Sequence, residues 1–194
     1  MQPPTFDNLP TPLLSPEFLR KLERLAVWML VTRAYVTPRV ARYGELLKEL
    51  DKGMGLDAPS FELSEDEARA TRDGLAGEIY TSAPVRRYVL LRLDELLANE
   101  PGVSYEHRLI TVEHVLPQHP RLDSEWSRTF TEDERRHWVH RLANLVLLNR
   151  AKNAQAQNYD FDVKKTSYFG GRNGVATFAL TSQVVHTPEW TPET

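Results

Sequence analysis

The chain has 194 residues, of which 41% are hydrophobic, enough for one sizeable domain or two small ones with a real core. It has no cysteine, which excludes disulfides and thiolate metal sites and makes a cytoplasmic location the default expectation. The net charge of -3 argues against a uniformly basic nucleic-acid-binding surface, and no apolar run approaches the ~20 residues of a membrane span.

Prolines are frequent in residues 1–14, which we interpret as a linker or entry arm. A linker there suggests that the chain is the tail end of a longer protein. Ser15, followed by proline and glutamate, is a typical cap and predicts a helix start. A second cap followed by proline, Thr37–Pro38, predicts another helix, which Gly53 and Gly55 end.

Two further helices are expected before the first strand. Ser64 and Glu67 have the spacing of a capping box for the third helix. The fourth is predicted at 83–98, where apolar residues recur every three or four positions. Residues 15–98 therefore predict a helical subdomain, for which a scaffold or interdomain stalk is the simplest role.

The second half of the chain alternates strands and helices. The predicted elements are a strand at 107–115, a loop at 117–131, a short helix capped by Thr131 and Glu134, a strand at 142–148 and a helix at 150–157. We expect the two strands to pair. Residues 170–194 contain glycines and late prolines and end without a closing element, so we expect a tail that is partly disordered or cut short.

Glu113 and His114 are two reactive side chains at the end of the first predicted strand, a poor choice for packing alone. Hydrolysis of a phosphodiester needs a base that activates water and a cation that takes charge on the phosphate. His114 suits the base, because histidine ordinarily titrates near neutral pH. Glu113 supplies one hard oxygen ligand for a metal ion. A buried, hydrogen-bonded histidine is the simpler interpretation of His114 taken alone.

Asn144 and Asn153 are the candidate partners of this pair. Asn144 would interrupt the second strand, where an amide is costly unless it is hydrogen-bonded, so we expect it to hold the loop that carries His114. Asn153 lies on the predicted helix, in a place to share Mg²⁺ or Mn²⁺ with Glu113. A zinc site at His137 and His140 has weak support, because no second matched pair accompanies them.

Together, the segments 113–118, 144–148 and 158–161, with Asn153 and Lys164, resemble an HNH (ββα-metal) nuclease. More narrowly, about 109–168 is similar to the HNH domain at the C-terminus of GmrSD-type modification-dependent restriction proteins. Those proteins carry a ParB-like nucleotide-hydrolysing domain at the N-terminus. The same two-domain layout occurs in phosphorothioate-sensing (Ssp-type) phage-defence proteins, and the spacing of the two asparagines also resembles that of RNA-guided nucleases.

The resemblance implies His114 as general base, Asn144 as the structural middle residue of the motif, and Glu113 and Asn153 as ligands of Mg²⁺ or Mn²⁺. One departure is Ala143, which stands where the family usually has glycine before the asparagine.

Four more residues follow from the same comparison and from charge. Asn158 and Lys164 match the trailing asparagine and lysine of the family and are expected to shape the site or touch phosphate. Arg150 and Lys152 are candidate phosphate contacts, although a plain solvated face explains them as well.

The expected fold is mainly α with a small antiparallel β element (α+β): a helical bundle at 15–98 plus a ββα-metal HNH core at 99–169. The expected function is a metal-dependent DNA endonuclease domain of a restriction or phage-defence protein, without membrane association, whose N-terminal sensor domain is missing from this chain. Two alternatives stay open: a non-catalytic DNA-binding or assembly module that keeps the fold, and an RNase.

Overall fold

The computed structural model describes residues 15–98, 110–149, 158–169 and 178–194, except the side chain of Tyr168. These residues are mainly helical, with one two-stranded antiparallel sheet, which confirms the predicted fold class. The chain divides into two compact units, Met1–Leu75 and Ala76–Thr194. The predicted linker at 1–14 and the predicted helix at 150–157 lie outside the described residues.

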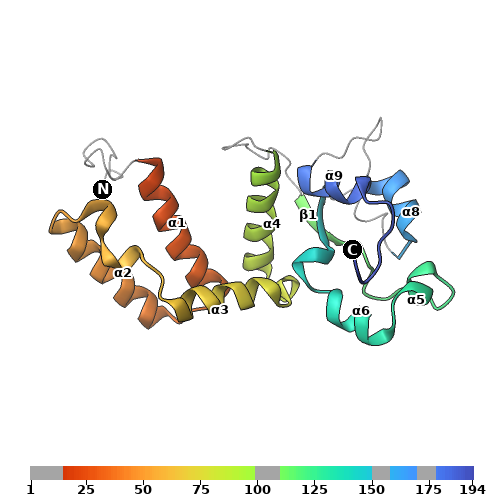
Figure 1. The fold of residues 1–194 in the computed structure, drawn as a ribbon, viewed down its shortest axis with the longest axis horizontal. Helices are drawn as coiled ribbons and strands as arrows, with labels where there is room; N and C mark the ends of the chain where they lie inside the picture. The colour runs from red at the N-terminus through yellow and green to blue at the C-terminus, as the bar shows by residue number, and fades with distance from the viewer. Residues whose placement is uncertain (1–14, 99–109, 150–157, 170–177) are drawn as a thin grey trace, which may run out of the picture. The chain divides into compact units, whose positions relative to one another are not determined.

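The first unit is built from α1 (Pro16–Val31), α2 (Val36–Asp51) and nearly all of α3 (Glu65–Ala76) (Figure 1). The Ser15 hydroxyl accepts a hydrogen bond from the backbone N–H of Phe18 at 3.1 Å, so the predicted cap of α1 is confirmed. The predicted cap of α2 is wrong, because the helix begins at Val36 without a side-chain cap. Proline is tolerated in the first turn, where its missing N–H would have no helical partner.

Two features confirm the predicted end of α2 and the predicted start of α3. Gly53 and Gly55 follow α2 with φ angles of 82° and 55°, values that glycine adopts at no steric cost. Ser64 and Glu67 form the reciprocal capping box of α3, with hydrogen bonds of 3.2 and 2.8 Å.

Two 3₁₀ turns, Gly55–Asp57 and Pro59–Phe61, complete the unit. Its core consists of Phe18, Leu25, Met29, Leu46, Ala58 and Phe61.

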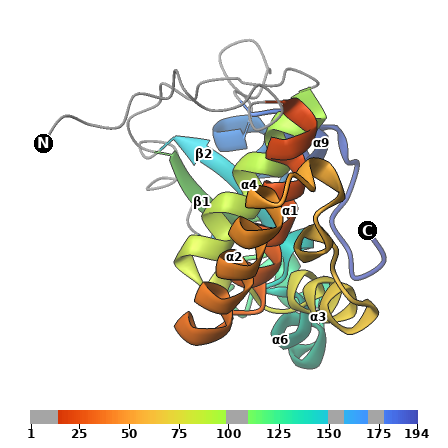
Figure 2. The ribbon, with the colours of Figure 1, turned by 90° about the vertical axis from the view of Figure 1, so that its left-hand side faces the viewer.

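The second unit contains α4 (Ala83–Ala98), whose bounds are those predicted, after the short 3₁₀ turn Ile79–Thr81. Its sheet pairs β1 (Ile110–His114) with β2 (Leu145–Asn149), which lie side by side in Figure 2. The antiparallel register sets Glu113 opposite Val146 and His114 opposite Leu145. Pairing of the two predicted strands is therefore confirmed.

Two predicted boundaries in this unit are wrong. The strand predicted at 142–148 begins only at Leu145, because Leu142–Asn144 forms a 3₁₀ turn; Asn144 therefore precedes β2 instead of interrupting it. The predicted loop at 117–131 contains a short helix, α5 (Glu125–Thr129), whose Trp126 is buried. The capping box of Thr131 and Glu134 at the start of α6 (Glu132–Trp138) is confirmed.

The C-terminal residues close the core of the second unit. The short helix α8 (Phe161–Val163) runs into a π-helix (Lys164–Phe169), and α9 (Ala179–His186) contacts α4 and β2. We expected a tail without a closing element, whereas Trp190 packs on Phe161 with ring centroids 5.6 Å apart. The core consists of Val115, Leu116, Trp126, Phe130, Val146, Leu148, Phe161, Phe169 and Val184. Within the described ranges, no helix is both long and apolar enough to cross a membrane.

Candidate active site at the end of β1

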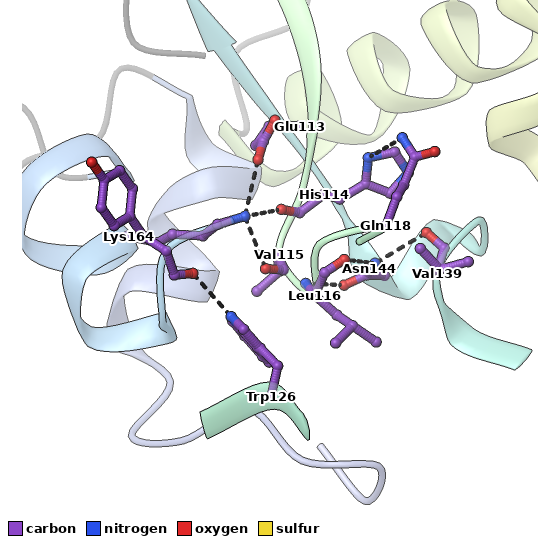
Figure 3. Close-up of polar contacts among 10 residues, drawn as sticks. Glu113, His114, Val115, Leu116, Gln118, Trp126, Val139, Asn144 and Lys164 are labelled. Atoms are coloured by element: carbon purple, nitrogen blue, oxygen red, sulfur yellow. Dashed lines mark hydrogen bonds and ion pairs between the residues drawn. The ribbon is translucent and has the colours of Figure 1, made fainter. Parts of the chain in front are cut away.

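Asn144 fastens the segment that follows His114 (Figure 3). Its Oδ1 accepts a hydrogen bond from the N–H of Leu116 at 2.6 Å, and its Nδ2 donates to the carbonyl oxygens of Leu116 at 2.9 Å and Val139 at 3.0 Å. Its own carbonyl oxygen accepts from the N–H of Val115 at 2.9 Å. Asn144 is 2% exposed, so these hydrogen bonds offset the free-energy cost of burying its amide group.

Replacing Asn144 by leucine is expected to lower the free energy of unfolding by about 3–5 kcal/mol, because two carbonyls and one N–H would lose their buried partner at about 1–3 kcal/mol each. Urea denaturation followed by circular dichroism measures the change. The matched control is Asn158→Leu, which alters an exposed amide in a turn and should change stability by at most about 0.5 kcal/mol. Equal urea midpoints for the two variants would contradict the role of Asn144.

Lys164 is fully buried and ties the end of β1 to the π-helix. Its Nζ donates to Oε1 of Glu113 at 3.0 Å and to the carbonyl oxygens of His114 at 2.6 Å and Val115 at 3.1 Å. An ammonium group has three donors, so all of them are used (Figure 3). Lys164 therefore fixes the backbone at the end of β1, and its side chain is fully buried in this structure.

Glu113 and Lys164 form a mostly buried ion pair, with side chains 12% and 0% exposed. Burial raises the pKa of the Glu113 carboxyl, which the charge of Lys164 opposes, and burial lowers the pKa of Lys164, which the charge of Glu113 opposes. The three hydrogen bonds donated by Nζ require the ammonium form, and we therefore describe both partners as charged.

The His114 ring lies on the opposite side of β1 from the Glu113 carboxylate, as successive residues of a strand do (Figure 3). His114 is 5% exposed, and its Nδ1 lies 3.4 Å from the side-chain nitrogen of Gln118, which is exposed. Burial, with added repulsion from His140, Lys164 and Arg86, lowers the pKa of His114 to about 3. The imidazole is therefore neutral at neutral pH, which is the form that a general base needs.

Two aromatic rings that the sequence analysis did not assign to the site surround His114. The ring of Tyr80 lies 4.1 Å from it and that of His140 5.7 Å from it, measured between centroids. Tyr80 also stacks on His140 with a centroid distance of 5.3 Å and an interplanar angle of 7°. Tyr80 falls in the turn before α4, and nothing in the sequence pattern connects it to His114.

Four candidate residues remain, and none of them is seen at this site in the described part of the chain. Asn158 is exposed in the turn before α8, whereas Arg150, Lys152 and Asn153 lie outside the described residues. No group of three or more His, Cys, Asp or Glu side chains within the described ranges is arranged to hold a metal ion. His137, considered with His140 for zinc, is exposed and packs edge-on against Trp138.

A family model described as GmrSD restriction endonucleases, C-terminal domain, matches residues 65–194. The chain belongs to this family. The matched range of the GmrSD C-terminal domain includes Tyr80, Glu113, His114, Asn144 and Lys164, and hence every described residue of the site. Membership places the chain among the nuclease domains of restriction proteins. No curated protein and no solved structure matches the chain.

Proposed function

We propose that this GmrSD C-terminal domain is a metal-dependent HNH endonuclease that nicks or cleaves DNA, with His114 as the base that activates water. The observation that carries the proposal is a carboxylate and an imidazole at successive positions at the end of a short strand, in a chain of a restriction endonuclease family. Two anchors hold this strand end: Asn144 binds the backbone of Leu116, and Lys164 binds the carbonyl oxygen of His114.

Nδ1 of His114 is the nitrogen that would meet the attacking water. It faces Gln118, whose exposed side chain is able to turn away and leave its place to a water molecule. The neutral ring accepts the proton as the water oxygen attacks phosphorus, a contribution of about 10²–10⁴-fold for a well-placed general base. The hydrogen bonds of Asn144 and Lys164 fix the backbone on which this ring is mounted.

The metal-binding residues in this proposal are Glu113 and Asn153. Glu113 fits the donor chemistry of Mg²⁺ or Mn²⁺, because its carboxylate supplies hard oxygen atoms, of which Oε1 also accepts a hydrogen bond from Lys164. When bound, the cation supplies positive charge to the phosphate and to the leaving oxygen. A phosphate that reaches this carboxylate and His114 would lie at the end of β1, where the two side chains diverge.

DNA is the proposed substrate, with Arg150 and Lys152 as proposed phosphate contacts. The proposal also includes a role in defence against phage and a nucleotide-hydrolysing sensor domain N-terminal to this chain. Under it, recognition of the DNA belongs to the sensor, and the isolated domain cuts with little sequence preference.

The experiment is cleavage of supercoiled plasmid by the wild-type chain with Mg²⁺, with Mn²⁺ or with EDTA. Nicked circles are expected with either metal and none with EDTA, and Glu113→Gln should shift the Mg²⁺ dependence to higher concentration, because a neutral amide is the weaker ligand. Equal cleavage in EDTA would refute metal dependence and leave Glu113 as the ion-pair partner of Lys164. A matched RNA transcript separates a DNase from an RNase, and plasmid that is bound but never cut would favour a binding module.

A further inference from the structure

Two ring nitrogens in the second unit are buried and without a hydrogen-bond partner: Nε2 of His114 and Nδ1 of His140. Among the described residues, these are the buried side-chain nitrogen or oxygen atoms in that condition. A buried polar atom without a partner costs about 1–3 kcal/mol, so such atoms are rare and call for a reason. Here the two atoms belong to neighbouring rings.

The two rings are close enough for a small shift to bring these atoms into hydrogen-bonding distance, although they are not bonded in this structure. Their centroids lie 5.7 Å apart and their planes cross at 65°, an edge-to-face contact. A linear N–H···N bond of about 3 Å places the two centroids about 5.2 Å apart, since each nitrogen lies about 1.1 Å from its ring centre. The rings therefore need to approach by at least about 0.5 Å, which a side-chain rotation can provide.

The surroundings of His114 determine which atom is the donor. The side-chain nitrogen of Gln118 faces Nδ1 of His114 at 3.4 Å, so Nδ1 is the acceptor there and the ring proton lies on Nε2. That proton lies inside the protein and needs an acceptor. Nδ1 of His140 is the unpartnered buried atom beside it.

His140 is itself held in place. Tyr80 stacks on its ring, and the N–H of Tyr80 donates to the carbonyl oxygen of His140 at 3.1 Å. The guanidinium of Arg86 lies over the Tyr80 ring, 4.4 Å from its centroid. An acceptor fixed in this way orients the ring that donates to it.

We propose that His140 is the positioning residue of the general base: its Nδ1 accepts the Nε2–H of His114 and fixes the tautomer in which Nδ1 of His114 takes the proton from water. The proposal rests on the proposed nuclease function. Without His140, the ring proton of His114 is free to occupy either nitrogen. A ring with its proton on Nδ1 cannot take a proton from a water molecule on the Gln118 side, because that nitrogen has no free lone pair. Tyr80 and Arg86 act through His140 by holding its ring.

The tautomer is measured directly by two-bond ¹H–¹⁵N NMR of imidazole-labelled wild-type protein in EDTA, with His114→Gln and His140→Asn used to assign the signals. We expect His114 to carry its proton on Nε2 and His140 to have an unprotonated Nδ1. A proton on Nδ1 of His114 would overturn the proposal. This measurement needs neither cleavage nor metal, so a wrong tautomer is distinguished from a failure of the proposed function.

The second part of the test measures the plasmid-nicking activity of His140 variants. His140→Phe keeps a ring for Tyr80 but has no acceptor, and we expect kcat for plasmid nicking to fall about 10–100-fold with KM unchanged, the usual range for a residue that orients another. His140→Asn offers an amide oxygen near the position of Nδ1 and should keep most of the activity. The matched control is His137→Phe, the same substitution at an exposed position three residues earlier. Equal activity of folded His140→Phe and wild type, or equal loss in His140→Phe and His140→Asn, would overturn the positioning role.

Discussion

Replacing His114 by alanine is expected to reduce plasmid nicking by about 10²–10⁴-fold, the contribution of a well-placed general base. Burial lowers the pKa of the ring to about 3, so nearly every molecule carries the ring in its neutral form at neutral pH. No other histidine among the described residues lies on β1. Steady-state nicking assays at saturating Mg²⁺ measure the loss.

A second substitution separates chemistry from folding. His114 is buried, so alanine leaves a cavity, whereas His114→Gln nearly keeps the volume and lacks a basic ring. Both variants should bind plasmid nearly as well as wild type in a gel-shift assay at low salt, because binding depends mainly on phosphate contacts. His119→Ala, on the exposed part of the same loop, is the control that should keep full activity. Normal nicking by the glutamine variant would exclude His114 as the base.

Lys164→Met is expected to lower the free energy of unfolding by about 3–5 kcal/mol, the range measured when one partner of a buried ion pair is removed. Methionine fits the space of the aliphatic stem but leaves the Glu113 carboxylate and the carbonyl oxygens of His114 and Val115 without their donor. Urea denaturation measures the change. Lys48→Met, at a lysine with a 69% exposed side chain, is the control and should cost at most about 0.5 kcal/mol.

The double variant Glu113→Gln with Lys164→Met tests whether the unpaired charge causes the loss. Removing the carboxylate charge as well should recover part of the stability, with a coupling of about 0.5–3 kcal/mol between the two sites. Strictly additive effects of the two substitutions would mean that the ion pair seen at 3.0 Å contributes nothing measurable.

The helices were largely predictable because their signals are local. The capping boxes at Ser64 and Thr131 and the apolar repeat at 83–98 each depend on residues within one or a few turns, and the structure contains all three. The pairing of the two strands was also predictable, since two apolar segments flanking a long connection have few other ways to bury their faces. Asn144 was recognised as an amide that needs partners, although it sits before the strand and not within it.

The surroundings of His114 were not predictable, because they depend on contacts between distant parts of the chain. Lysine is almost never fully buried unless it is paired, so a charge pattern favours solvent for Lys164 while the structure shows it 0% exposed. Tyr80 lies in the 3₁₀ turn before α4, and the stack of Tyr80 on His140 leaves no periodic signal in the sequence. The sequence connected His140 only with His137, through a spacing that gives weak support to a zinc site.

The anchoring of β1 by Lys164 has a consequence for how this domain can be recombined. Lys164 reaches Glu113 across 51 positions of sequence, so a graft of the two strands alone would carry the Glu113 carboxylate and the His114 carbonyl group without their ammonium donor. Tyr80, which contacts His140, precedes α4 in the sequence, whereas His114 follows it. A chimera joined between α4 and β1 would therefore take Tyr80 from one parent protein and His114 from the other. Chimeras should therefore exchange the segment from Tyr80 through the π-helix as one block.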